Sequence, residues 1–286
     1  MSKGYEAPVE VRELEKLIND FTYQNGLDVK DVFRDFLRYT INVFSVPGSP
    51  SLTDWRYTQE QNKAFHEMFV AWIRIMDTQI KIKGWYDALG DLFISLTSQR
   101  GQQQKGQFFT PENICELTQS LVMGNETKIN TLYDPAVGSG RMLLAAKAKN
   151  PQSYLVGWDL DYTCCLMCVC NFLINSCVGE VVCMDSIGMD KFKGAWLVNV
   201  AYYRTGLPSV QWMNEQEYLL YKQTDIPAYV FFLDQEKYDE YFRMRKIWAE
   251  FMTLFNDTPA GPSKPPVDKA PENTGEPTQN DKKDQP

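Results

Sequence analysis

The sequence feature that most constrains the fold is a short apolar run that ends in an acid and a glycine-rich turn. The run enters Asp134-Pro135-Ala136-Val137-Gly138-Ser139-Gly140-Arg141, and helical sequence resumes at Met142. A strand, a turn and a helix in this order are typical of the first unit of a doubly wound α/β fold, in which ligands bind at the carboxyl edge of the sheet. Glycines at 138 and 140 allow positive φ and a close approach of the backbone to a ligand. Taken alone, the pattern also describes an ordinary tight turn, and it differs from the G-x-G-x-x-G dinucleotide pattern.

Two further acids end the next apolar runs. Asp159 lies nineteen residues after Gly140, in Gly157-Trp158-Asp159-Leu160-Asp161, and Asp185 follows in Cys183-Met184-Asp185-Ser186. An acid at the end of the second strand is placed to accept hydrogen bonds from the ribose of a nucleoside-containing cofactor. The acid of the third strand could accept from an adenine amino group.

The spacing of apolar residues in the sequence changes near residue 98. Before it, apolar residues recur at three- and four-residue spacings, which predicts helices. After a polar stretch at 98–106, apolar runs alternate with helix-length spacers, which predicts a parallel sheet with helices on both faces. We therefore predict a helical domain over 1–98, an α/β domain over 99–256 that ends in a strand at 229–233 and a helix at 235–255, and a disordered, proline-rich tail over 257–286.

The net charge of −8 argues against a protein that holds nucleic acid by bulk electrostatics alone. No run of eighteen apolar residues is present, which argues against a membrane span, and the N-terminus is unlike a secretion signal. These features predict a cytoplasmic protein whose seven cysteines are reduced thiols.

Metal binding is disfavoured by the spacing of the cysteines. Cys165 and Cys168 form one C-x-x-C pair on an apolar helical stretch, without a second pair at zinc-finger spacing. Core packing of these thiols is therefore preferred to a metal site. The single histidine, His66, is isolated and cannot by itself support histidine-based catalysis.

Three motifs together resemble a known family. Gly-Gln-Phe-Phe-Thr-Pro at 106–111, the turn at 134–141 and the Gly-Trp-Asp-Leu-Asp of 157–161 look like those of the N6-adenine DNA methyltransferases, in the order found in type I restriction-modification modification subunits. The resemblance covers about residues 85–200. It implies a Rossmann-like S-adenosylmethionine-dependent methyltransferase fold, preceded by a helical domain.

The resemblance also implies which residues would hold S-adenosylmethionine. The Phe-Thr-Pro segment and the glycine turn would meet the methionine end, the acid at 159 the ribose, and the acid at 185 the adenine. The candidate cofactor-binding residues are Phe108, Phe109, Thr110, Pro111, Asp134, Pro135, Ala136, Gly138, Ser139, Gly140, Asp159, Leu160, Asp185 and Ser186.

The catalytic motif departs from the family pattern of Asn or Asp, Pro-Pro and an aromatic residue. Asn199 and Tyr202 match as the residues that would bind and stack on a flipped adenine, but Val200 and Ala201 replace the prolines. A weakened active site and a simple strand end both fit this segment. One clear apolar run follows it, so the sheet is expected to be shorter than in the family.

Two functions follow from these motifs. The first is an adenine N6-methyltransferase that acts on DNA with a recognition subunit, as part of a hetero-oligomer. The alternative is a degenerate S-adenosylmethionine-binding module with a regulatory or anti-restriction role. Methylation of RNA or of protein glutamine is a further possibility, because an asparagine also suits those planar nitrogen acceptors.

Overall fold

The computed structural model describes residues 6–46, 49, 52, 54–98, 109–123 and 131–223, which all belong to one compact unit, Met1–Tyr238. Phe108, the predicted strand at 229–233, the helix at 235–255 and the tail at 257–286 lie outside the described residues. No helix in the described ranges is both long and apolar enough to cross a membrane.

The first part of the described chain is helical. A short 3-10 turn, Val9–Val11, precedes four helices: α1 (Arg12–Asn25), α2 (Val29–Val43), α3 (Gln59–Lys83) and α4 (Ala88–Ser98). Local sequence fixes their ends, because the Asp28 side chain accepts from the Lys30 N–H, and Thr58 forms a capping box with Gln61. The prediction of helices before residue 98 is confirmed.

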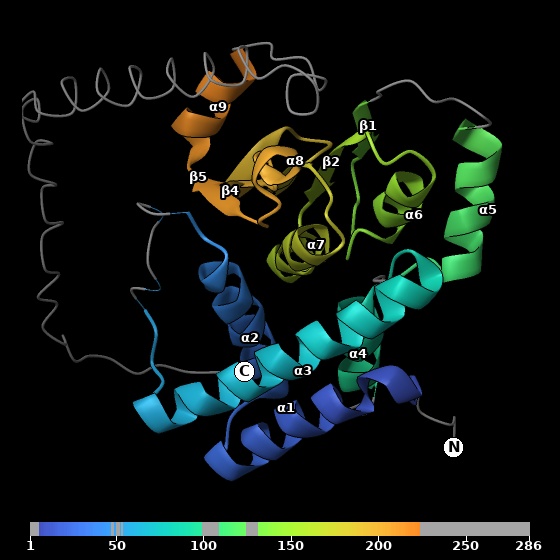
Figure 1. Ribbon diagram of the computed structural model, residues 1–286. Helices are drawn as coiled ribbons and strands as arrows, with labels where there is room; N and C mark the ends of the chain where they lie inside the picture. Colours follow the sequence, from blue (N-terminus) through green and yellow to red (C-terminus); the bar gives the residue numbers. More distant parts are fainter. Residues whose placement is uncertain are drawn as a thin grey trace, which may run out of the picture. The chain divides into compact units, whose positions relative to one another are not determined.

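A five-stranded sheet with its helices follows, so the predicted α/β class is confirmed. The elements are α5 (Glu112–Met123), β1 (Thr131–Asp134), α6 (Arg141–Lys149), β2 (Tyr154–Asp159), α7 (Tyr162–Ile174), β3 (Gly179–Asp185), β4 (Asp190–Val198), α8 (Tyr202–Thr205), β5 (Val210–Met213) and α9 (Glu215–Gln223). The strands lie in the order β1-β2-β3-β4-β5 (Figure 1).

The sheet is only partly parallel, which corrects the predicted parallel sheet. Strands β1, β2 and β3 run parallel, whereas β4 is antiparallel to β3 and β5 is antiparallel to β4. The reason is the connection between β3 and β4, which comprises only residues 186–189. A parallel crossover needs a dozen or more residues, so the chain can only turn back as a hairpin.

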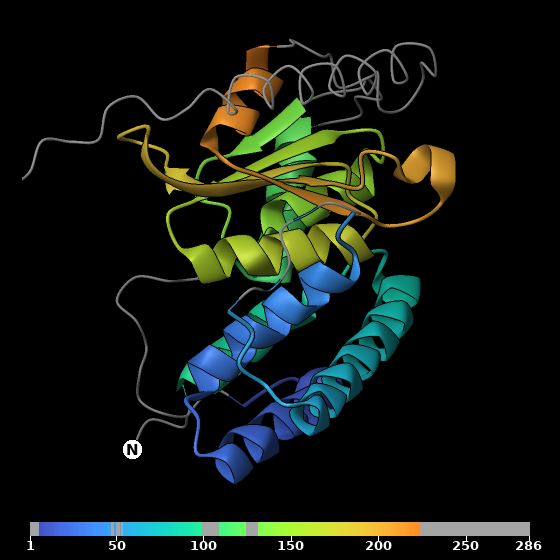
Figure 2. The same cartoon turned by 90° about the vertical axis from the view of Figure 1, so that its left-hand side faces the viewer.

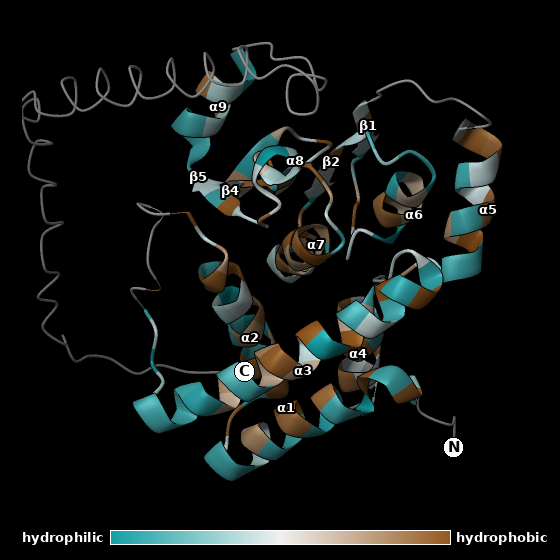
Figure 3. Ribbon diagram, in the orientation of Figure 1, coloured by the Kyte–Doolittle hydropathy of each residue, from teal (hydrophilic) through white to brown (hydrophobic). Residues whose placement is uncertain are grey.

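Helices cover both faces of the sheet. Figure 2 shows α9 on one face and α7 on the other, with the helical part of the chain beyond α7. Helix α7 is buried along almost its whole length and is largely hydrophobic (Figure 3). Because α2 packs against α7, one hydrophobic cluster runs from Phe36 of α2 through Phe172 of α7 to Trp196 of β4.

The cysteines of α7 belong to this core. Cys164, Cys165, Cys168 and Cys170 are all buried free thiols, which confirms the prediction that they pack in the interior. Within the described residues, no group of three or more histidine, cysteine, aspartate or glutamate side chains is placed to hold a metal ion.

Candidate functional site

The candidate site lies at the carboxyl edge of the parallel strands. The register pairs Asp134 of β1 with Gly157 of β2, so both strands end at the same edge, two residues apart. The glycine turn after β1 and the acidic segment after β2 are therefore neighbours. This is the arrangement that the sequence predicts for Asp134, Gly138 and Asp159.

Asp159 is bonded directly to the glycine turn. Its Oδ2 accepts the Gly138 N–H at 2.8 Å, and its Oδ1 accepts the Asp161 N–H at 2.8 Å. The Val137 N–H donates to the Trp158 carbonyl at 2.9 Å, which adds a second link between the two segments. Each carboxylate oxygen has two acceptor positions, so Asp159 retains capacity for a ligand hydroxyl.

The turn favours glycine at both positions. Gly138 has φ 55° and Gly140 has φ 97°, both in the left-handed region. A Cβ on Gly138 would lie 3.3 Å from Phe109 Cε1, and one on Gly140 would lie 3.1 Å from Cys168 Sγ. A side chain at either position would therefore combine backbone strain with a tight contact. Pro135 and Ala136 complete the turn on its exposed side.

Burial perturbs two carboxylates at this edge. It raises the pKa of Asp159, although the hydrogen bonds from Asp161 and Gly138 partly offset the effect. Burial likewise raises the pKa of Asp134, whose Oδ1 accepts the Ala136 N–H at 3.0 Å. Perturbed carboxylates in one place are typical of ligand sites. Leu160, beside them, exposes half of its surface.

The Phe-Thr-Pro segment reaches the turn through Phe109. Its ring lies beside Gly138, with Cε1 3.3 Å from the place that a Cβ on Gly138 would take. The ring also packs edge-on against Phe93 at 5.9 Å and lies under the Arg141 guanidinium at 5.9 Å. Thr110 is half-buried, and the Pro111 carbonyl accepts the first N–H bonds of α5. Phe109 is thus the described residue of this segment that touches the turn.

Asp185 lies at the same edge but is engaged in its own turn. Its carboxylate accepts from the Ile187 and Gly188 N–H groups at 3.1 and 3.0 Å and from Lys191 Nζ at 2.9 Å. The Gly188 N–H, the Lys191 ammonium and the Ile187 N–H together lower the pKa of Asp185 to about 2. Asp185 and the half-exposed Ser186 therefore shape the β3–β4 hairpin, and their contact with adenine stays a prediction.

Asn199 and Tyr202 are not brought to this edge. Strand β4 is antiparallel, and Val198 pairs with Gly179 at the start of β3, so Asn199 lies at the opposite, amino edge. It is fully buried at φ 58°. Tyr202 begins α8 beyond it and packs against Tyr203.

The Asn199 amide is bonded inside the protein through both its nitrogen and its oxygen. Its Nδ2 donates to the carbonyls of Phe172, Leu173 and Cys177 at 2.9, 3.2 and 3.0 Å, and its Oδ1 accepts the Ser209 N–H at 3.0 Å. It thereby joins the last turn of α7 to the β5 side of the sheet. In this position Asn199 caps the end of β4, and a catalytic role of Asn199 and Tyr202 stays a prediction.

The sequence reasoning missed a buried polar network behind the turn. Ser139 is buried, and its Oγ donates to Asp87 at 2.5 Å instead of facing the site. Arg141 donates to Asp87 and to Asp91, next to α4 and in its first turn. The only signal is the acidic spacing Asp87-x-x-x-Asp91, fifty residues from Arg141, and nothing in the sequence links the two segments.

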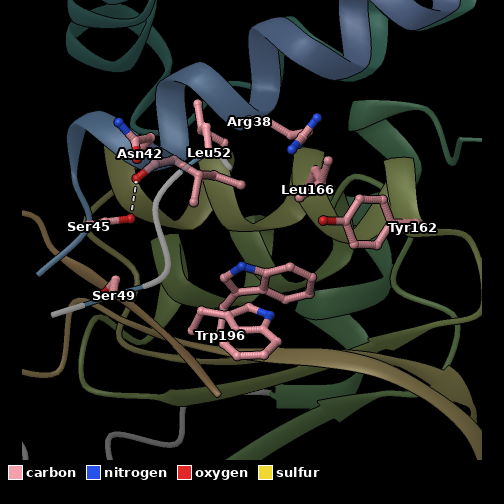
Figure 4. A pocket seen from close by; sticks show the side chains of 10 residues that line it. Arg38, Asn42, Ser45, Ser49, Leu52, Tyr162, Leu166 and Trp196 are labelled. Atoms are coloured by element: carbon pink, nitrogen blue, oxygen red, sulfur yellow. Dashed lines mark hydrogen bonds between the residues drawn. The ribbon is translucent and has the colours of Figure 1, made fainter. Parts of the chain in front are cut away.

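A separate cavity lies away from the turn. It has a volume of about 150 Å³ and lies between α2, α7 and the antiparallel strands (Figure 4). Its lining includes Arg38 and Asn42 of α2, Tyr162 and Leu166 of α7, and Trp196 and Trp212 of β4 and β5. None of the residues that line it belongs to the glycine turn.

Comparison with known proteins bears on the same segment. Residues 85–217 match the model of the N-6 DNA methylase family. The methylase subunit of the type I restriction enzyme MpnII of Mycoplasma pneumoniae is 30% identical over 102 residues, a match that covers 33% of this chain and 19% of that subunit. The chain thus matches about a fifth of that relative's length.

Two solved structures are also similar. One is a Listeria monocytogenes protein assigned to the class I S-adenosylmethionine-dependent methyltransferases, with 11% identity, 62% of this chain and 54% of that chain covered, and a TM-score of 0.40. The other is a type I restriction-modification methyltransferase subunit of Streptococcus thermophilus, with 21% identity, 62% and 39% covered, and a TM-score of 0.30. The similarity to the N-6 DNA methylase family therefore lies in residues 85–217 of this chain.

Proposed function

We propose that this chain binds S-adenosylmethionine at the β1–β2 edge and works in the N6 methylation of adenine in DNA. The observation that carries the proposal is the hydrogen bond of 2.8 Å from the Gly138 N–H to Asp159, within the segment that matches the model of the N-6 DNA methylase family. It joins the two motifs that a nucleoside-containing cofactor needs on one edge of the sheet.

The residues present at the edge fit this cofactor. The turn has a left-handed backbone at Gly138 and Gly140, and its residues Pro135, Ala136 and Gly138 are at least partly exposed to a ligand. Asp159 would accept from the ribose hydroxyls, and the turn with Phe109 would enclose the methionine end. When bound, S-adenosylmethionine supplies an activated methyl group on its sulfonium. The protein's part is to hold it and to present the Asp159 carboxylate to the ribose.

The acceptor base needs a binding group that the described edge does not supply. Asn199, the candidate for this role, is buried at the amino edge of the sheet. The net charge of −8 also leaves little general attraction for DNA. We therefore propose that a DNA-recognition subunit completes the site, as part of a cytoplasmic restriction-modification assembly.

Transfer of a labelled methyl group tests the proposal. Purified chain, alone and with the products of neighbouring genes, is incubated with labelled S-adenosylmethionine and DNA, and the label in N6-methyladenine is measured. The proposal predicts transfer that requires a partner. Absence of transfer in every combination, with the cofactor bound, would refute the methylation role.

A second function is favoured by the position of Asn199. If its amide is occupied as a structural cap, the chain can bind the cofactor without turnover and act as a regulatory or anti-restriction module. That function predicts S-adenosylmethionine binding by calorimetry together with no label in DNA. A partner-dependent transfer would count against it.

A further inference from the structure

Asp87 is a buried carboxylate whose bonds converge on the glycine turn. It is fully buried at the start of α4, the last helix of the helical part. It accepts four hydrogen bonds: from the Gly90 N–H at 2.8 Å, Asn171 Nδ2 at 2.7 Å, Ser139 Oγ at 2.5 Å and Arg141 Nε at 2.5 Å. A carboxylate has about four acceptor positions, so all of them are filled.

These bonds hold the turn on both sides of Gly140. Ser139 precedes this glycine and Arg141 follows it, and both donate to the same oxygen, Oδ2 of Asp87. Asn171 Nδ2 also donates to the Ser139 carbonyl at 2.8 Å, which fixes the backbone of the turn as well as its side chains. The left-handed conformation at Gly140 is therefore fixed from outside the turn.

The network is buried, and one guanidinium lies between two carboxylates. Arg141 is 6% exposed and forms ion pairs with both Asp87 and Asp91, while Tyr86 Oη donates to Asp91 at 3.1 Å. Removing one member of such a buried set is costly, because its hydrogen-bond partners are left unpaired away from water. The fit is also tight, because a Cβ on Gly90 would lie 2.1 Å from Asp87 Oδ2 and 2.9 Å from Ser139 Oγ.

We propose that Asp87 is a positioning residue: from the helical part of the chain it holds the turn at 138–141 in the shape that binds the cofactor, and so sets cofactor affinity. Asp87 makes no contact with the ligand in this proposal. The proposal rests on the proposed function, because it assumes that the turn binds S-adenosylmethionine. It adds that the helical part acts directly on cofactor binding.

The test compares two buried carboxylates. Asp87→Asn removes the charge and one acceptor oxygen beside the turn. The control, Glu180→Gln, does the same on β3, where Glu180 is also fully buried and accepts from Tyr218 Oη at 3.1 Å and Lys222 Nζ at 3.0 Å. Two quantities are measured below the unfolding transition: the Kd for S-adenosylmethionine, and the amide hydrogen exchange of residues 136–141 without ligand.

Asp87→Asn is expected to raise the Kd about tenfold or more and to accelerate exchange in the turn, while Glu180→Gln changes both less than twofold. Equal effects of the two variants, or an unchanged Kd and unchanged exchange in Asp87→Asn, would overturn the proposal. If Asp87→Asn does not fold, Ser139→Ala removes one of the same hydrogen bonds without a change of charge. A smaller increase in the Kd and a smaller acceleration of exchange in the turn are then expected. Unchanged Kd and exchange in Ser139→Ala would overturn the proposal.

The exchange measurement separates this proposal from the proposed function. A wild-type chain that fails to bind S-adenosylmethionine refutes the cofactor site itself. Exchange in the turn that does not depend on Asp87 refutes the positioning role, whatever the wild-type affinity is.

Discussion

At the scale of single residues, the contacts of each side chain determine whether a motif residue lies at the candidate site. Asn199 has the residue type that the catalytic motif requires, yet its side chain is fully buried, with Nδ2 donating to three carbonyls at 2.9–3.2 Å and Oδ1 accepting the Ser209 N–H. Identity at a motif position does not fix where the fold places the side chain. Asp159 shows the opposite outcome, because its position at a strand end does place it beside Gly138.

The position of Asn199 predicts a stability effect. Asn199→Ala should lower the free energy of unfolding by about 2–4 kcal/mol. The alanine leaves buried carbonyls unpaired, and it keeps a side chain at positive φ without the hydrogen bonds that compensate for the strain in the wild type. Asn199→Gly is the matched control, since it removes the amide but tolerates the backbone, and should cost about 1–3 kcal/mol. Urea denaturation measures both. A fully stable Asn199→Ala would contradict the structural role.

At the scale of the elements, the sequence predicts that a strand is present better than it predicts the direction in which the strand runs. The strand ends at Asp134 and Asp159 can be predicted, because an apolar run stops at an acidic residue and the turn that follows is rich in glycine or acidic residues. The direction of β4 is not readable from its apolar run, because both directions bury the same residues. The connection of four residues before it requires a hairpin, but its length is known only from the structure, in which β4 begins at Asp190.

The network around Asp87 could not be predicted for a different reason. Its members lie on α4, on the turn before α6 and on α7, and pairing between residues so far apart in sequence depends on how the helices pack. The burial of Ser139 could not be predicted either, because the sequence pattern of the turn is the same whether its hydroxyl faces a ligand or the core.

The β3–β4 hairpin predicts a pH effect. The pKa of Asp185 is lowered to about 2, so the carboxylate stabilises the folded hairpin fully above its ordinary value of 3.8, and this contribution is lost as the pH falls towards 2. Lys191→Ala should raise the pKa of Asp185 towards 3.8, measured by NMR titration of the carboxyl group. Lys193→Ala is the control, because Lys193 donates to the Leu160 carbonyl instead. A titration of Asp185 unchanged by Lys191→Ala would remove the ion pair from the account.

At the scale of the whole described unit, the helical part and the sheet share one core. The cluster joins Phe36 and Trp72 of the helices to Leu155 and Trp196 of the strands, and the Asp87 network adds polar links between them. The two parts are therefore expected to unfold together, although the sequence divides them near residue 98.

A single cooperative transition is the testable consequence. Circular dichroism, which follows mainly the helices, and tryptophan fluorescence, which includes Trp196 in the sheet, should give coincident denaturation curves. S-adenosylmethionine at about one hundred times its Kd should stabilise both curves by about 2.7 kcal/mol. Two separated transitions, with only one of them shifted by the ligand, would show that the parts are independent.

We propose that the acid of β2 and the glycine turn together form an S-adenosylmethionine site. The most direct measurement is calorimetric titration of S-adenosylmethionine into wild-type protein, Asp159→Ala and Asn199→Gly. Loss of hydrogen bonds to a charged acceptor costs about 1.5–3 kcal/mol. Asp159→Ala should therefore weaken binding about tenfold or more, and Asn199→Gly, at the opposite edge, should leave the affinity of the folded protein unchanged. Equal affinity of wild type and Asp159→Ala would contradict the account.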